Sequence, residues 1–189
     1  MQADDQLTKT HPVPLAYLLT FHTYGTWMHG DEDGSVDPAH NQYGQPLLEP
    51  DPERMNQEQA KMAQSIYLLD KPRRDCVVRT IQEVCNYRGW TLLAAHVRST
   101  HVHVVLHADQ APEKVMADLK AYSSRRLTEA GFDSRDRKRW AIHGSTRYLW
   151  DAQSADIAIQ YVVEEQGEAM AVFKSSKLLS EYVSTDPRP

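Results

Sequence analysis

Residues 98–107, which read Arg-Ser-Thr-His-Val-His-Val-Val-Leu-His, alternate with a period of two, as a half-buried β-strand does. The apolar side chains at positions 102, 104 and 106 lie on one side of such a strand and face a core. His101 and His103 then stand side by side on the opposite face. The strand therefore predicts a sheet with one buried face and one face that carries two imidazoles.

The spacing of His101 and His103 suits a metal ion. Side chains at positions i and i+2 of a strand start about 6 to 7 Å apart at the backbone, so two ring nitrogens can converge on one divalent cation. Such pairs also occur as solvated or hydrogen-bonded histidines, and two ligands do not make a metal site. A metal site here requires a third ligand and a reactive group from elsewhere in the chain.

The composition is that of a globular chain, because 41% of the 189 residues are apolar and 25% are charged, enough for one sizeable core. We predict one domain over residues 14–168 with an inserted loop over 29–55, a disordered N-terminus over 1–13 and a C-terminal tail over 169–189. No apolar run approaches the roughly 20 residues of a membrane-spanning helix, and the N-terminus shows no signal-peptide pattern. We therefore expect a soluble, cytoplasmic protein.

The charge distribution bears on nucleic-acid binding. A net charge of −5 argues against a protein that coats nucleic acid indiscriminately. Positive charge is nevertheless concentrated in residues 111–150, with nine Lys or Arg against five Asp or Glu. A solvated face explains many such runs, but a local basic surface on an acidic protein also suits a partner held at one defined place.

The order of predicted elements places the histidine strand in an antiparallel sheet. The short link over residues 98–100 joins it to the preceding strand as a β-hairpin. Helix start and stop signals also stand out, such as Asp70-Lys71-Pro72 before a periodic apolar run and Gly89 after it. The predicted order is a strand over 14–27, helices from about 56 and over 70–88, strands over 90–97 and 101–107, a helix over 111–131, a strand or short hairpin over 139–150 and a helix over 152–166. This order indicates an α+β, ferredoxin-like split βαβ fold with two helices on one face of the sheet, followed by one further helix.

The last predicted helix brings a phenol and a carboxylate to its edge. Tyr161 lies beside the apolar arc of this helix, and Glu165 lies one turn later on the same flank. A tyrosine at such a boundary is often an amphipathic residue that packs at the edge of a core. Placed over the open face of the histidine strand, it would instead supply the reactive group that the two imidazoles require.

Several segments together resemble a known family. The Thr-His-Val-His-Val-Val run at 100–105, the segment over 140–150 and the following helix with Tyr161 are similar to the HUH single-tyrosine transposases of bacterial insertion sequences. The run Thr-Tyr-Gly-Thr-Trp-Met-His-Gly-Asp at 23–31 resembles more closely their REP-associated tyrosine transposase relatives. The resemblance spans roughly residues 15–167. It implies a metal-dependent strand transferase that acts on single-stranded DNA at a hairpin end.

The resemblance also implies roles for individual residues. By the family pattern, His101 and His103 hold Mg²⁺ or Mn²⁺, and Tyr161 attacks the scissile phosphate to leave a 5′-phosphotyrosine and a free 3′-hydroxyl. In the better-known members the third ligand is a glutamine four residues after the tyrosine, whereas here Glu165 occupies that position and Gln166 follows it. A regular helix favours Glu165, because the fifth residue swings about 140° away from the tyrosine. Gln166 takes its place if the helix loosens at its end.

Contacts to DNA are predicted from charged and aromatic side chains, because cations bind phosphates and aromatic rings stack on unpaired bases. The predicted phosphate contacts are Lys120, Arg125, Arg126, Arg139 and Arg147, and the predicted stacking residues are Tyr24, Trp27 and Tyr148. Each of these aromatic residues is also a candidate for the core. Tyr122 is a rival nucleophile, but its place on the apolar stripe of a helix favours packing.

Two other functions are consistent with this sequence. One is a regulator on the same fold that binds nucleic-acid hairpins without cutting them. The other is a phosphodiesterase that activates water, with His101, His103 and residues 143–145 as its site. The sequence also leaves open whether the protein acts as a monomer or as a homodimer that shares sites.

Overall fold

The computed structural model describes residues 14–27, 53, 57 and 60–176. In chain order the elements are β1 (Ala16–His22), α2 (Lys71–Arg88), β2 (Thr91–Val97), β3 (His101–His107), α3 (Pro112–Glu129), β4 (Ser145–Leu149), α4 (Ala152–Glu164) and β5 (Ala171–Lys174). None of the helices within these described ranges is both long and apolar enough to cross a lipid bilayer.

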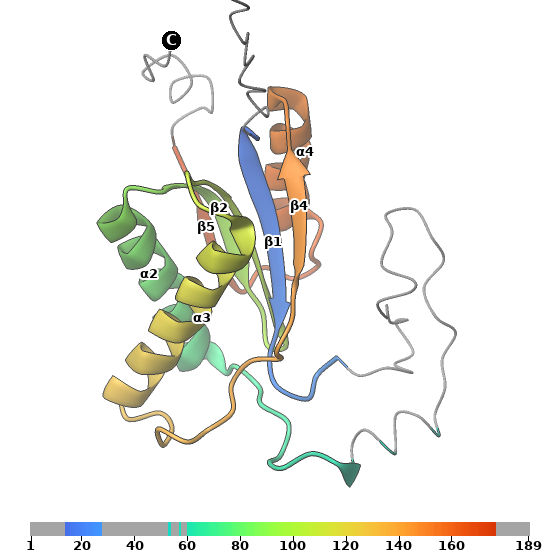
Figure 1. Ribbon diagram of the computed structural model, residues 1–189, viewed down its shortest axis with the longest axis vertical. Coiled ribbons are helices and arrows are strands. Elements are labelled where there is room, and N and C mark those ends of the chain that lie inside the picture. Colours follow the sequence, from blue (N-terminus) through green and yellow to red (C-terminus); the bar gives the residue numbers. More distant parts are fainter. Residues whose placement is uncertain (1–13, 28–52, 54–56, 58–59, 177–189) are drawn as a thin grey trace, which may run out of the picture.

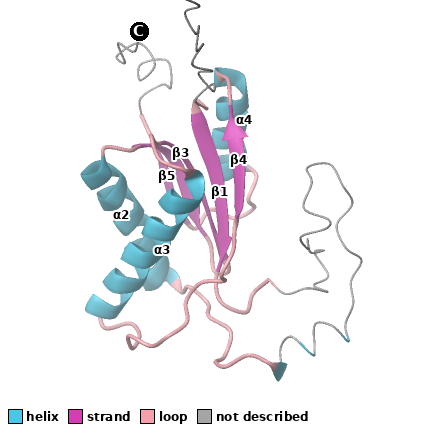
Figure 2. Ribbon diagram, in the orientation of Figure 1, coloured by secondary structure: helices cyan, strands magenta, loops and turns pink. Residues whose placement is uncertain are grey.

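The five strands form one antiparallel sheet in the order β4-β1-β3-β2-β5. Helices α2 and α3 lie together over one face of this sheet, and α4 lies behind β1 and β4 on the other side (Figures 1 and 2). The predicted α+β, ferredoxin-like split βαβ fold is confirmed. Strand β3, which carries the histidines, is the central strand of the five.

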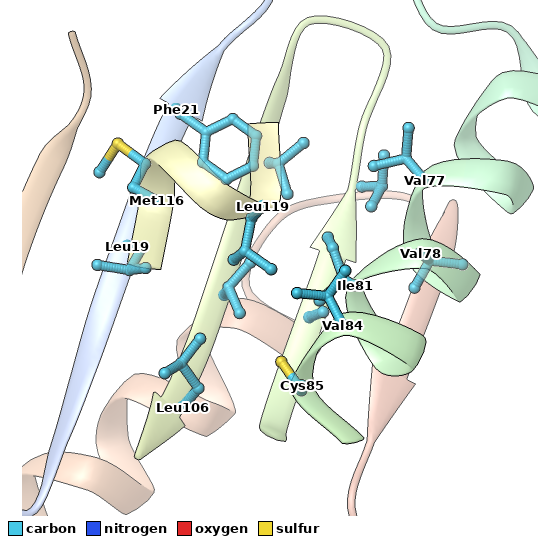
Figure 3. Close-up of a cluster of buried hydrophobic side chains, with 14 of the residues drawn as sticks. Leu19, Phe21, Val77, Val78, Ile81, Val84, Cys85, Leu106, Met116 and Leu119 are labelled. Carbon is cyan, nitrogen blue, oxygen red and sulfur yellow. The ribbon is translucent and has the colours of Figure 1, made fainter. Parts of the chain in front are cut away.

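The larger core lies between the sheet and the pair α2 and α3. Leu19 and Phe21 of β1 and Leu106 of β3 meet Ile81 of α2 and Leu119 of α3 there (Figure 3). All five side chains are fully buried. At roughly 1.5 to 3 kcal/mol for each large side chain removed from water, this layer fixes which face of β3 is apolar. The histidines therefore have to emerge on the face toward α4.

Local signals explain the bounds of α2. The carboxylate of Asp70 accepts a hydrogen bond from the backbone N–H of Arg73 at 3.0 Å, and Pro72 lies in the first turn. At the other end Gly89 adopts a left-handed conformation with φ of 71°, and its N–H bonds the carbonyls at the helix end. The predicted start and end of this helix are confirmed.

Other boundaries differ from the prediction. Strand β1 ends at His22 rather than near residue 27, because the chain turns at residues 24–25, where Gly25 takes φ of 76° and the backbone N–H of Thr26 donates to the carbonyl of Thr23 at 3.3 Å. Of the helix predicted from about residue 56, the described residues 57 and 60 are helical, as is residue 53, whereas residues 61–69 form no helix. In the predicted tail, β5 pairs with β2 and extends the sheet. The predictions for residues 1–13, for the loop over 29–55 except residue 53, and for the tail beyond residue 176 lie outside the described residues.

Candidate active site

The two histidines of β3 lie next to each other on the face of the sheet toward α4. The ring centroids of His101 and His103 are 4.8 Å apart. Val102 and Val104, the alternate residues, are fully buried in the core on the opposite face. The alternation of the sequence thus produces the paired imidazoles directly.

Each imidazole is held through its Nδ1 atom. A hydrogen bond of 2.8 Å joins Nδ1 of His103 to Oγ1 of Thr20, its register partner on β1. A second one, of 3.0 Å, joins Nδ1 of His101 to Oγ1 of Thr100. Both contacts use Nδ1, and partners of this kind are what orient metal-binding histidines in general.

The surroundings keep both imidazoles neutral. Burial, with the neighbouring His101 as a further cause, lowers the pKa of His103 to about 3. Burial also lowers the pKa of His101, and the positive charge of Arg98 acts in the same direction. Neutral imidazole is also the form that a metal ligand requires.

Tyr161 approaches this pair from α4. Its ring centroid lies 5.6 Å from that of His103, with the two rings nearly perpendicular. The apolar face of the helix, with Ala155, Ala158 and Val162, is buried against the sheet. Tyr161 projects from the edge of that face and is 39% exposed, so its hydroxyl can be reached from outside.

The end of α4 decides which residue accompanies the imidazoles. The helix ends at Glu164 rather than at Gln166, and Glu165 already has non-helical angles. Nε2 of Gln166 donates to the backbone carbonyl of Tyr161 at 3.3 Å. Gln166 also lies close enough to His101 and His103 to raise the pKa of both imidazoles, against the larger effect of burial.

The regular helix that favoured Glu165 as third ligand is therefore not what forms. Within the described ranges, no group of three or more His, Cys, Asp or Glu side chains is arranged to hold a metal ion. The side chains gathered here are instead the imidazoles of His101 and His103 and the amide of Gln166. Nitrogen and oxygen donors of this kind fit a divalent cation such as Mn²⁺ or Mg²⁺.

His96 of β2 connects the elements around the site. It is fully buried on β2 and is the register partner of His103. Its Nδ1–H donates to the carbonyl of Val162 in α4 at 3.0 Å, and its Nε2 accepts from the backbone N–H of Met170 at 3.2 Å. One neutral imidazole thus fixes both the helix of Tyr161 and the segment after Gln166.

The turn after β1 supports the site from the other side. Gly25 takes φ of 76°, and the hydroxyls of Thr23 and Thr26 both donate to the carbonyl of Thr100, each at 3.0 Å. These contacts explain the Thr-Tyr-Gly-Thr sequence, because its two threonines stabilise the link over residues 98–100 that precedes His101. Tyr24 packs against the core, and its hydroxyl accepts the backbone N–H of Ala63 at 3.1 Å, so its prediction as a stacking residue gives way to a structural role.

Two aromatic rings extend the site toward this turn. His22, the register partner of His101, lies with its ring centroid 5.5 Å from that of His101. Trp27 stacks on His22 with centroids 4.6 Å apart. Trp27, a predicted stacking residue, therefore lies beside the imidazoles. His22 was not found from the sequence, since only the register of β1 against β3 could reveal it.

Three predicted phosphate contacts lie on α3, which covers the face of the sheet opposite to the imidazoles. Nζ of Lys120 donates to the carbonyls of Ala141 and His143 at 2.9 and 3.0 Å. Arg126 is ion-paired with Glu83 at 2.9 Å, and the guanidinium of Arg125 lies over the ring of Tyr122. Their positions separate them from the imidazoles by the thickness of the sheet.

The remaining predicted contacts divide between the two faces. Arg139 is 4% exposed, and its Nε pairs with Asp133 at 3.3 Å, so burial replaces DNA contact as its role. Arg147 is the register partner of Leu18 on β1, a residue that packs on the α4 side, and so shares the face of the histidines. Tyr148 packs edge-on against Tyr17, on the opposite face.

Comparisons with known proteins agree with this arrangement. The family model described as "Transposase IS200 like" matches residues 63–164, more than half of the chain. A search of the curated proteins found no match.

Two solved structures resemble the chain. One is the structure of a REP-associated tyrosine transposase bound to a REP hairpin, with 9% identity and a TM-score of 0.44, over 87% of this chain and 72% of that one. The other is a candidate transposase from Deinococcus radiodurans R1, with 16% identity and a TM-score of 0.41, over 89% of this chain and 100% of that one. Both likenesses are too weak to carry an argument. The extent of the family match is sufficient by itself: this chain belongs to the IS200-like transposases.

Proposed function

We propose that the protein is a metal-dependent single-stranded DNA endonuclease and strand transferase that cuts near hairpin ends through a 5′-phosphotyrosine intermediate. The observation that carries this proposal is the convergence of four side chains from one chain. Tyr161 lies against His103, His103 lies against His101, and Gln166 lies close enough to both imidazoles to raise their pKa. Membership in a transposase family supports the same reaction class.

The proposed ligands of the cation are Nε2 of His101, Nε2 of His103 and the amide oxygen of Gln166. A bound Mg²⁺ or Mn²⁺ would offset the negative charge that develops on a phosphate oxygen during attack. The protein's contribution is to hold these three donors in place. Thr20 and Thr100 hold the rings, and the carbonyl of Tyr161 holds the amide.

In the proposed reaction the phenol oxygen of Tyr161 forms a bond to the scissile phosphorus as the bond to the 3′-oxygen of the preceding nucleotide breaks. The phenol loses its proton and the departing 3′-oxygen gains one, so the products are a 5′-phosphotyrosine and a 3′-hydroxyl. One phosphoester replaces another. Rejoining to a second strand therefore needs no ATP.

The two alternative functions are outcomes of the test. For the water-activating phosphodiesterase, His143 would have to act with His101 and His103. His143 instead lines a cavity of about 490 Å³ together with Met116 and Lys120 of α3, on the other face of the sheet. A hairpin-binding regulator would bind DNA on the same surface and would not require Tyr161.

The test is incubation with labelled single-stranded hairpin oligonucleotides, drawn from the DNA that flanks the gene, in the presence of Mn²⁺, followed by denaturing electrophoresis. We expect a metal-dependent covalent protein–DNA band that disappears in Tyr161→Phe. Tyr122→Phe is the matched control, because its phenol packs against the core across the sheet. Cleavage without a covalent band would indicate the phosphodiesterase, and binding of these hairpins without cleavage would indicate the regulator.

A further inference from the structure

Arg98 occupies the turn between β2 and β3, three residues before His101. Its backbone N–H donates to the carbonyl of His101 at 2.9 Å, which closes the turn. Its side chain reaches across to the segment between α4 and β5. There Nη1 donates to the carbonyl of Glu168 at 3.1 Å. A Cβ placed on Gly167 would lie 3.8 Å from Nη2.

These contacts place the guanidinium at the rim of the proposed metal site. Gly167 directly follows Gln166, whose side chain lies close enough to both imidazoles to raise their pKa. The charge of Arg98 also helps to lower the pKa of His101 and of His96, although burial is the larger cause for both. The guanidinium is therefore within electrostatic reach of the ring that begins the histidine pair.

The surroundings of Arg98 differ from those of other arginines in the protein. Arg73, Arg88 and Arg126 each form an ion pair with a carboxylate. For Arg98 the one side-chain hydrogen bond recorded in the described part of the chain goes to a neutral carbonyl, that of Glu168. A guanidinium has five N–H donors in a planar fork that matches the geometry of phosphate. Most of this fork remains for an anion.

We propose that Arg98 binds a backbone phosphate of the single strand within one nucleotide of the phosphate that Tyr161 attacks. The inference rests on the proposed function, since it requires a single strand to pass over His101 and His103. The hydrogen bond to Glu168 orients the fork before DNA arrives and ties the turn of Arg98 to the segment that carries Gln166. Arg98 is thus an anchoring residue for the strand.

A binding measurement tests the phosphate contact without requiring chemistry. In a Tyr161→Phe background, the affinity for a fluorescein-labelled hairpin oligonucleotide is measured by anisotropy at several salt concentrations. We expect Arg98→Gln to weaken binding about tenfold. We also expect it to reduce the slope of log K against log[salt] by about 0.7, the value for one phosphate of a single strand. Arg98→Lys should keep the slope.

The matched control is Arg79→Gln, which removes the same charge from the exposed face of α2, across the sheet from the histidines. It should leave the affinity and the slope unchanged. An equal loss in both variants would indicate a general effect of net charge and would overturn the proposal. Thermal unfolding of each variant shows whether Arg98→Gln still folds, and Arg98→Lys keeps the test valid if it does not.

A scan with methylphosphonates locates the phosphate. Each oligonucleotide carries one uncharged methylphosphonate, and the scissile position is known from cleavage by the unaltered protein. Neutralising a phosphate within one nucleotide of that position should weaken binding when Arg98 is present and have no effect in Arg98→Gln. If the effect of a methylphosphonate depends on Arg98 only at a distant phosphate, or at no phosphate, the proposal is overturned. An unaltered protein that cuts no hairpin would instead contradict the proposed function, so the two failures are distinguishable.

Discussion

Gln166 and Glu165 are neighbours at the end of α4, but they make different contacts. The Gln166 side chain donates to the carbonyl of Tyr161 and lies close enough to both imidazoles to raise their pKa, whereas Glu165 closes the helix through its backbone. We predict that Gln166→Ala weakens Mn²⁺ binding by roughly tenfold or more, the lower end of what loss of a supporting partner costs at metal sites. Glu165→Ala should leave it nearly unchanged. Isothermal titration calorimetry with Mn²⁺ measures the affinity of both variants, and Gln166→Glu should restore binding. A larger loss of Mn²⁺ affinity in Glu165→Ala than in Gln166→Ala would make Glu165 the ligand.

A second set of side chains stabilises the fold far from the histidines. The hydroxyl of Tyr67 donates to Asp133, which also pairs with Arg73 at 3.0 Å and with Arg139 at 3.3 Å. Burial and the hydrogen bond to Asp133 raise the pKa of Tyr67 to about 12. Burial alone would raise the pKa of Asp133, but the hydrogen bonds from Tyr67 and Arg73 outweigh it and leave that pKa below its usual value.

The pKa shifts of Tyr67 and Asp133 determine how the stability of the fold changes with pH. A raised pKa of Tyr67 stabilises the folded state fully below about pH 10, and this stabilisation is lost as the pH rises toward 12. The lowered pKa of Asp133 gives stability that is lost only as the pH falls below about 4. We predict that Tyr67→Phe costs about 1.5 to 3 kcal/mol at neutral pH. The gap to wild type should narrow between pH 10 and 12 in urea unfolding. A gap that stays constant over this range would contradict the account.

Helix α4 acts as a unit because its end sets the position of Gln166. Gly167 takes φ of 73° after the helix, and Gly89 takes φ of 71° after α2. A Cβ meets no close neighbour at either position, so alanine adds backbone strain of about 1 to 2 kcal/mol at both. We predict that both Gly→Ala variants lower the thermal midpoint similarly. Only Gly167→Ala should also weaken Mn²⁺ binding, as measured by calorimetry. Equal Mn²⁺ affinity in the two variants would show that the helix end does not position the ligand.

Elements with local signals were predictable from the sequence. The alternation at 101–107 and the cap at Asp70 give β3 and α2 directly. The end of α4 was not predictable, since nothing in a helical pattern shows that the chain leaves the helix at Glu165. Local sequence also does not show on which face of the sheet a charged residue lies. Lys120 and Arg147 are both cations of the basic segment, yet only the sheet order places Arg147 with the histidines.

At the scale of the whole molecule, the main hydrophobic core and the candidate active site lie on opposite faces of the sheet. Helices α2 and α3 lie on one side of the sheet and α4 on the other (Figure 1). The large core lies on the side of α2 and α3, and the imidazoles, Tyr161 and Gln166 gather on the side of α4. All the proposed groups come from a single copy. We predict that a mixture of His103→Ala and Tyr161→Phe proteins does not recover the cleavage that each variant lacks. Recovery of the covalent band on mixing would show that copies share their sites, as a homodimer of that kind requires.

The role of Tyr161 as the nucleophile is tested by peptide mapping of the covalent protein–DNA species. After nuclease digestion of the DNA and cleavage with trypsin, residues 148–174 form one peptide that contains both Tyr148 and Tyr161. We predict that this peptide carries the nucleotide mass and that its fragmentation places the mass on Tyr161. A nucleotide on Tyr148 or Tyr122, or cleaved DNA with no modified peptide, would contradict the claim.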